Sequence, residues 1–236
     1  VVKKISDLYS EKVLHKDDQY EPKKVDPTLM NYPEQGDGYV TVIQTGKPKY
    51  QWSNATLNFK RPDKNNLIIY ETWVYDHTAE RTIEGMMNRL FYYKDMGINA
   101  IELMPIQEFD GNLNWGYSPN HYFALDKAYG TPEQFKTFVD SCHALGIAVI
   151  LDMVFNHATG LNPMNKLYPY GTELAHNPWF NVTAPHSDNV YEDWNHDFEL
   201  TKLMFTRALQ YWLKEYKIDG YRMDLSHGLC GTTNNA

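Results

Sequence analysis

A basic and an acidic side chain stand two positions apart near the end of the sequence, at Arg222 and Asp224. The surrounding residues 219–225 have the composition of a short strand, and alternate side chains of a strand share a face. Arg222 and Asp224 are therefore expected on the same face. A guanidinium beside a carboxylate favours its ionised form, which a carboxylate nucleophile needs. A structural ion pair at a sheet end has the same spacing, so this pair alone leaves both interpretations open.

A second group of polar side chains lies in and just after the apolar segment 147–155. Asp152 stands inside the segment, and Asn156 and His157 follow it directly. An aspartate inside so apolar a strand is costly unless it is paired. Arg222 on a neighbouring strand is the expected partner. A single histidine is more often structural, but Asn156 and His157 together at the end of a strand favour a functional site.

Aromatic residues form the third group, which includes Trp115 and Tyr117. Aromatic faces suit sugar rings, although a loop that packs on its own domain would use the same residues.

Four strand-like segments must position these groups, at 67–74, 99–105, 147–155 and 219–225. Helical patterns separate them: apolar residues recur over 83–93, Thr131 begins a second helix with a capping pattern, and a third carries Leu200, Leu203, Met204, Ala208 and Trp212. Alternating strands and helices predict an α/β fold with parallel strands. In closed barrels of this kind the active site lies at the carboxyl ends of the strands.

The chain divides into three parts by composition. Residues 1–66 are rich in proline and predict an extended, partly β segment, with one strand at 38–43. Residues 67–157 and 198–236 carry the strand–helix units. Residues 158–197 form an insertion far longer than an ordinary connection.

The composition of the chain argues against two kinds of binding partner, nucleic acids and membranes. The net charge of −8 over 236 residues argues against a nucleic acid, and we expect none. No apolar run approaches the ~20 residues that cross a bilayer, so a membrane span is not expected either. The sequence shows no signal peptide; we expect a soluble protein and make no prediction of its location. Its two cysteines are too few for a disulfide framework.

The three groups, in this order and with this insertion, resemble the α-amylase family of glycoside hydrolases and transglycosylases. The resemblance runs from about residue 67 to 228 and includes 97–105 and 146–157. It implies a (β/α)8 TIM barrel of which this chain holds the first four units. It also implies a retaining double displacement on α-glucans such as starch, glycogen or pullulan-like polysaccharides.

The same resemblance implies a role for each matching residue. Asp224 would be the nucleophile and Arg222 its ionic partner, with Asp152 and Asn156 supporting the site. The substrate-binding residues would be Tyr117, His157, Trp115 and His227. The chemistry needs no cofactor, but Asn156 and Asp197 match positions that hold a structural calcium ion in many members.

The sequence departs from the family pattern at two points, which concern calcium binding and catalytic activity. His227 and Gly228 stand where many calcium-dependent members have Lys-His. The family's proton donor comes from a fifth strand, so we expect this chain to be an inactive fragment, completed by the rest of its own barrel. Alternatives are a branching or transglycosylating enzyme, a non-catalytic sugar-binding relative, and a metal-dependent hydrolase that uses Asp152, His157 and Asp224. Arg222 would repel a metal in the last case.

Overall fold

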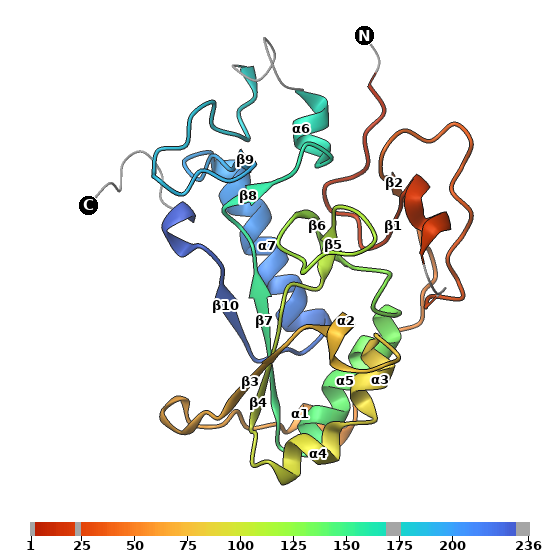
Figure 1. The fold of residues 1–236 in the computed structure, drawn as a ribbon, viewed down its shortest axis with the longest axis vertical. Coiled ribbons are helices and arrows are strands. Elements are labelled where there is room, and N and C mark those ends of the chain that lie inside the picture. The colour runs from red at the N-terminus through yellow and green to blue at the C-terminus, as the bar shows by residue number, and fades with distance from the viewer. Residues whose placement is uncertain (1–2, 22–24, 169–175, 230–236) are drawn as a thin grey trace.

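The computed structural model describes residues 3–21, 25–168 and 176–229, and a four-stranded parallel sheet lies at its centre (Figure 1). Its strands are β3 (Ile69–Thr72), β4 (Ala100–Leu103), β7 (Ala148–Met153) and β10 (Gly220–Met223). They stand in the order β10-β7-β4-β3, so each strand pairs with the next one along the chain. This order confirms the prediction of four consecutive parallel strands.

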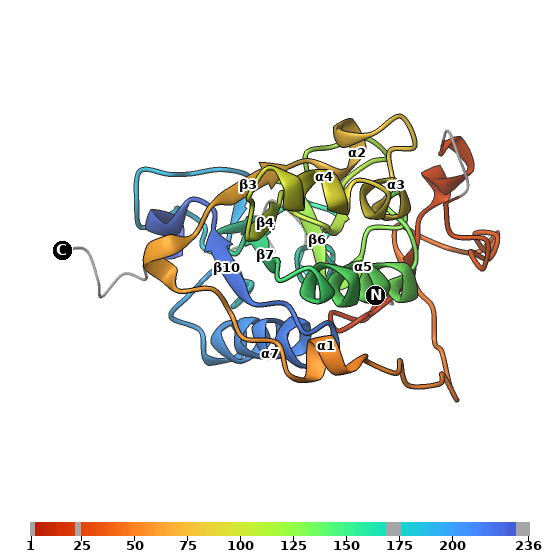
Figure 2. The same cartoon turned by 90° about the horizontal axis from the view of Figure 1, so that it is seen from below.

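The two faces of the sheet differ in character. Val149, Leu151 and Leu103 point to one face and are fully buried. In the view from below, α3, α4, α5 and α7 lie along one side of the four strands (Figure 2). The opposite, inner face carries polar groups: Glu71 is exposed, and Glu102, its register partner, is half-buried.

Helices of very different length connect the strands. Their bounds are α1 (Asn54–Leu57), α2 (Val74–His77), α3 (Ile83–Met87), α4 (Leu90–Asp95), α5 (Pro132–Ala144), α6 (Pro163–Leu167) and α7 (Glu199–Glu215), with 3-10 turns at η1 (Lys16–Tyr20), η2 (Lys64–Asn66) and η4 (Ser226–Leu229). The single helix expected over 83–93 is two helices, because Arg89 N bonds to Met86 O, three residues back, and so breaks the α-helical pattern. On α7, Leu200 and Leu203 are exposed and not part of the buried face.

The predicted start of α5 is a complete capping box. Gln134 N donates to Thr131 Oγ1 at 3.1 Å, and Thr131 N donates to Gln134 Oε1 at 2.8 Å. We expect Thr131→Ala to lower the free energy of unfolding by about 1 kcal/mol in urea denaturation. Ser141→Ala is the control, because the Ser141 hydroxyl returns a bond to Thr137 O within the same helix. An equal loss in both variants would contradict the capping role.

Part of the aromatic segment predicted as a loop is a buried hairpin. Strand β5 (Gln107–Phe109) pairs antiparallel with β6 (Pro119–Leu125), and all residues of both strands are buried. Burial on both faces explains why β6 shows no alternation of polar and apolar residues.

The described part of the insertion is anchored by a short antiparallel pair, β8 (His157–Ala158) with β9 (Glu192–Asp193). The hydroxyl of Tyr122 on β6 joins its two ends: it donates to His157 O at 2.9 Å and accepts from Trp194 Nε1 at 2.8 Å. Trp212 Nε1 of α7 donates to Tyr122 O at 2.8 Å. The hairpin, the insertion and α7 therefore share one buried network.

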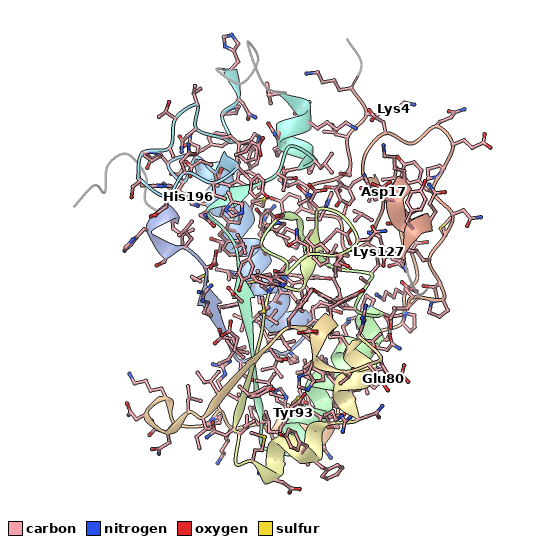
Figure 3. The ribbon with its side chains drawn as sticks, in the orientation of Figure 1. Lys4, Asp17, Glu80, Tyr93, Lys127 and His196 are labelled. Carbon is pink, nitrogen blue, oxygen red and sulfur yellow. The ribbon has the colours of Figure 1, made fainter. Side chains whose placement is uncertain are left out.

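The N-terminal segment is mostly irregular. Strand β1 (Val13–Leu14) pairs antiparallel with β2 (Val40–Thr41), so the strand expected over 38–43 shrinks to two residues. A buried cation, Lys127, joins this segment to the hairpin: its ammonium contacts Glu108 of β5 and lies 3.2 Å from Asp18 Oδ1 of η1. Lys127 and Asp17 mark this junction in Figure 3. We call Lys127, Glu108 and Asp18 the lysine clasp.

No helix among the described residues is long and apolar enough to cross a membrane.

Candidate functional site

The two charged groups of β10 share one face, as the strand pattern predicts. Arg222 is the register partner of Asp152 on β7. Arg222 Nη1 donates to both carboxylate oxygens of Asp152, at 3.2 and 3.0 Å, and to Asp224 Oδ1 at 2.5 Å. The expected pairing of Asp152 with Arg222 is confirmed. One guanidinium thus links a fully buried carboxylate to Asp224, whose side chain keeps 22% of its surface exposed.

Tyr117 completes the hydrogen bonding of Asp152. Its hydroxyl donates to Asp152 Oδ2 at 2.9 Å. Burial, together with the neighbouring Asp152, raises the pKa of Tyr117, so the phenol stays protonated and keeps donating. Burial also raises the pKa of Asp152, while the bonds from Tyr117 and Arg222 oppose that effect. No pattern in the sequence predicts the bond from Tyr117.

The turn before Tyr117 is fixed by its backbone. Gly116 has φ +94°, and a Cβ there would lie 2.2 Å from Pro105 O. Asn114 Oδ1 accepts from Gly116 N at 2.9 Å. Only glycine allows this close approach with a positive φ, and the approach sets the direction of the Tyr117 ring.

His157 lies against the backbone of Tyr117. Its side chain is buried, and its Nε2 lies 2.8 Å from Tyr117 O. A carbonyl oxygen only accepts, so Nε2 carries a hydrogen. Burial lowers the pKa of His157, so the ring is neutral at pH 7 and Nδ1 is an acceptor without a hydrogen-bond partner. His157 therefore holds the Tyr117 turn, and its hydrogen bond to a sugar stays a prediction.

The remaining predicted residues lie apart from this network. Trp115 is 62% exposed, two residues before Tyr117. The side chain of His227 is 90% exposed, and its nearest ionic neighbour is Asp188 at 3.8 Å. His227 contacts none of the clustered groups because η4 turns it outward, so its expected place in the substrate site is not seen.

One of the two residues predicted to bind calcium, Asn156, has the surroundings of a metal ligand. The amide of Asn156 is buried, and neither its oxygen nor its nitrogen has a hydrogen-bond partner, which fits an oxygen ligand for a hard cation. Asp197, the second expected ligand, is exposed. Within the described ranges, no three His, Cys, Asp or Glu side chains converge as a metal site. A calcium ion held by Asn156 and Asp197 stays a prediction.

Gly228 stands where many calcium-dependent members of the resembled family have histidine, and its surroundings explain this difference. A Cβ at Gly228 would lie 2.6 Å from the Cβ of Asn156, so a side chain cannot follow His227 in this turn. The turn η4 packs against the strand end instead.

Comparison with known proteins places the chain in a family. Residues 56–201 match the α-amylase catalytic domain. The malto-oligosyltrehalose trehalohydrolase of Saccharolobus solfataricus is 36% identical over 86% of this chain and 34% of its own length. That of Rhizobium sp. is 32% identical over 86% of this chain and 32% of its own length. The chain thus spans about a third of the length of these curated relatives.

Solved structures show the same fold. The maltogenic α-amylase AmyB of Thermotoga neapolitana has a TM-score of 0.59 and 28% identity, over 69% of this chain and 40% of that one. A pullulanase from Anoxybacillus sp. LM18-11, complexed with maltotetraose, has a TM-score of 0.69 and 24% identity, over 97% of this chain and 35% of that one. These structures imply the (β/α)8 barrel, of which the parallel sheet here is a part. The match of residues 56–201 to the catalytic domain shows that this chain belongs to the α-amylase family.

Proposed function

We propose that this chain carries the nucleophile of a retaining glycosidase acting on α-glucans, and that the nucleophile is Asp224. The observation that carries the proposal is the contact of Arg222 with both Asp152 and Asp224 at the carboxyl end of β10. Asp152 is fully buried and already bonded, whereas Asp224 is partly exposed. Of the two carboxylates, Asp224 is the one able to reach a substrate.

The proposed reaction has two displacements. A carboxylate oxygen of Asp224 attacks the anomeric carbon, the glycosidic C–O bond breaks, and the leaving oxygen takes a proton from a carboxylic acid. Water then attacks the glycosyl ester, gives its proton to the same acid in its base form, and releases Asp224. Arg222 keeps the attacking oxygen in place, and Tyr117 stacks against the reacting sugar.

The acid must be a second carboxyl group ~5–5.5 Å from the nucleophile. Asp152 does not fill this role, because it is fully buried and accepts bonds from Tyr117 and Arg222. We therefore propose that the acid comes from another strand of the barrel and that the 236-residue chain alone does not hydrolyse glucans.

The relatives suggest the first substrate to try. The S. solfataricus protein is named for the hydrolysis of malto-oligosyltrehalose, and a Bacillus subtilis relative, 31% identical over 61% of this chain, is a maltogenic amylase. We propose malto-oligosaccharides, with malto-oligosyltrehalose first among them, as the substrate class.

A fluorinated maltosyl fluoride tests the nucleophile directly, because fluoride leaves without an acid and the fluorine on the sugar slows hydrolysis of the ester. We expect mass spectrometry to find one maltosyl group on the peptide that contains Asp224. Asp188→Asn should label as the wild type does, and Asp224→Asn should not label. A label on any other carboxylate would overturn the assignment.

A further inference from the structure

A cavity of about 400 Å³ opens at the end of the sheet where β10 begins, whereas Asp224 lies where β10 ends. It lies between the segment that follows α1, the end of α5 and the turn from α7 to β10, and α1 lies beside both longer helices in the view from below (Figure 2). Two cationic side chains line the cavity, Arg61 and Lys217, and Asp219 is the only carboxylate among its described lining residues. The cavity wall is therefore positive, although the whole chain carries a net charge of −8.

The carboxylate of Asp219 is already engaged by the protein. Its Oδ2 accepts from Val149 N of β7 at 2.8 Å and lies 2.9 Å from His143 Nε2 of α5, and its side chain is only 7% exposed. The other ring nitrogen of His143 lies 3.0 Å from Thr56 Oγ1, and the Phe59 ring stacks on the imidazole at 4.0 Å. Asp219 thus joins α5 to the sheet, and one carboxylate cannot neutralise both cations of the cavity.

The guanidinium of Arg61 is only partly used. Its Nε lies 3.5 Å from Asp219 Oδ1, and its side chain is 64% exposed. Within the described ranges, its two terminal nitrogens have no hydrogen-bond partner. The planar guanidinium can donate two parallel hydrogen bonds to the oxygens of a phosphate group.

Lys217 keeps a side chain at a backbone position that favours glycine. Its φ is +56°, and it follows Tyr216, which ends α7. Glycine is the usual residue directly after a helix end in this left-handed conformation, because a Cβ there costs free energy. Lys217 is half-buried, and no other described residue pairs with its ammonium. A strained backbone that carries an unpaired cation to a cavity indicates that the cation has a ligand.

We propose that this cavity binds a phosphate group, held between Arg61 and Lys217. The guanidinium supplies directed hydrogen bonds and the ammonium supplies a compact charge. A cavity of this size is within the range of small-molecule sites and is larger than a phosphate ion, so it accepts inorganic phosphate or the phosphate monoester of a small metabolite. The inference goes beyond the proposed glycosidase chemistry and does not depend on Asp224.

Isothermal titration calorimetry with inorganic phosphate and with glucose 6-phosphate tests the site, on the protein expressed from its complete gene. We expect the wild type to bind phosphate with a Kd of about 1 mM or below. Lys217→Gly should weaken binding about tenfold or more, because it removes one of the two cations. The variant should keep the urea midpoint of the wild type or exceed it, because glycine relieves the strain at this φ, so weaker binding would not reflect unfolding.

Lys214→Ala is the matched control. Lys214 is exposed in the last turn of α7 and does not line the cavity, so its loss removes the same charge from a neighbouring position. Its phosphate affinity should stay within about twofold of the wild-type value, since exposed charges are screened by salt.

Three results would overturn the phosphate site: a wild-type protein that binds neither ligand, an unchanged affinity in Lys217→Gly, or an equal loss in Lys214→Ala. The two ligands identify the source of the phosphate group. Tighter binding of glucose 6-phosphate, lost in Lys217→Gly, would support a phosphate monoester. Equal or tighter binding of inorganic phosphate, lost in the same variant, would support the free ion.

Discussion

Replacing Asp224 by asparagine lowers kcat for malto-oligosaccharide hydrolysis by an expected factor of about 10⁴ or more, since the covalent step loses its nucleophile. The measurement uses the protein expressed from its complete gene. The side chain keeps its shape, and Arg222 keeps both bonds to Asp152. We therefore expect KM to change little and the protein to stay folded.

Asp188→Asn is the matched control for this variant. Asp188 is also partly exposed, and its nearest ionic contact is the exposed His227, 3.8 Å away. Its removal should leave kcat within about twofold, as is usual for a residue outside the transition-state contacts. If Asp224→Asn retained a tenth of the wild-type kcat, the nucleophile would have to be another residue.

Lys127→Met breaks the lysine clasp and should lower the free energy of unfolding by about 3–5 kcal/mol at pH 9, where Glu108 is ionised, because it leaves buried carboxylates without their cation. The side chains of Lys127 and Glu108 are only 8% and 3% exposed, so water does not replace the lost partner. Urea denaturation measures the change. Lys47→Met is the control: its pair with Glu133 is exposed and should be worth less than about 1 kcal/mol.

The cost of Lys127→Met should depend on pH. Burial raises the pKa of Glu108 to about 8, against an opposing effect of Lys127. A carboxyl group with a raised pKa holds a proton in the folded state that the unfolded chain releases, so its contribution to stability falls as pH rises from about 4.5 to about 8. Without Lys127 the pKa rises further. Up to about pH 8 Glu108 is protonated in both folded proteins and the cost stays level, so the cost should be larger at pH 9 than at pH 6. A cost that is equal at both values would contradict the clasp.

The sheet and the central ion pair follow from the sequence because their signals are local. Apolar runs of strand length, separated by helical patterns, suffice to order four parallel strands. Placing Arg222 beside Asp152 needs only this order and the rule that a buried charge is paired. The start of α5 is likewise predicted from four consecutive residues, 131–134.

The features that sequence reasoning missed depend on contacts between distant segments. The bond from Tyr117 to Asp152 joins a turn to a strand 35 residues away. The lysine clasp joins η1 to β5 and to the residues just after β6, although Asp18 and Lys127 lie far apart in the sequence. Strand β6 has no polar–apolar alternation because it is buried on both faces. The residue type of His157 does not reveal that its Nε2 bonds to Tyr117 O, and its hydrogen bond to a sugar stays a prediction.

The hydrogen bonds of Tyr122 affect which parts of this protein's sequence can change in evolution. Its side chain fixes the insertion at both ends, at His157 and at Trp194, and Trp212 fixes its own backbone. Exposed residues of the insertion, such as Val182, can be exchanged while His157 and the turn it holds stay where they are. Evolution and protein engineering alike are thereby free to change the exposed surface of the insertion, whereas a change at Tyr122 would disturb both of its anchors.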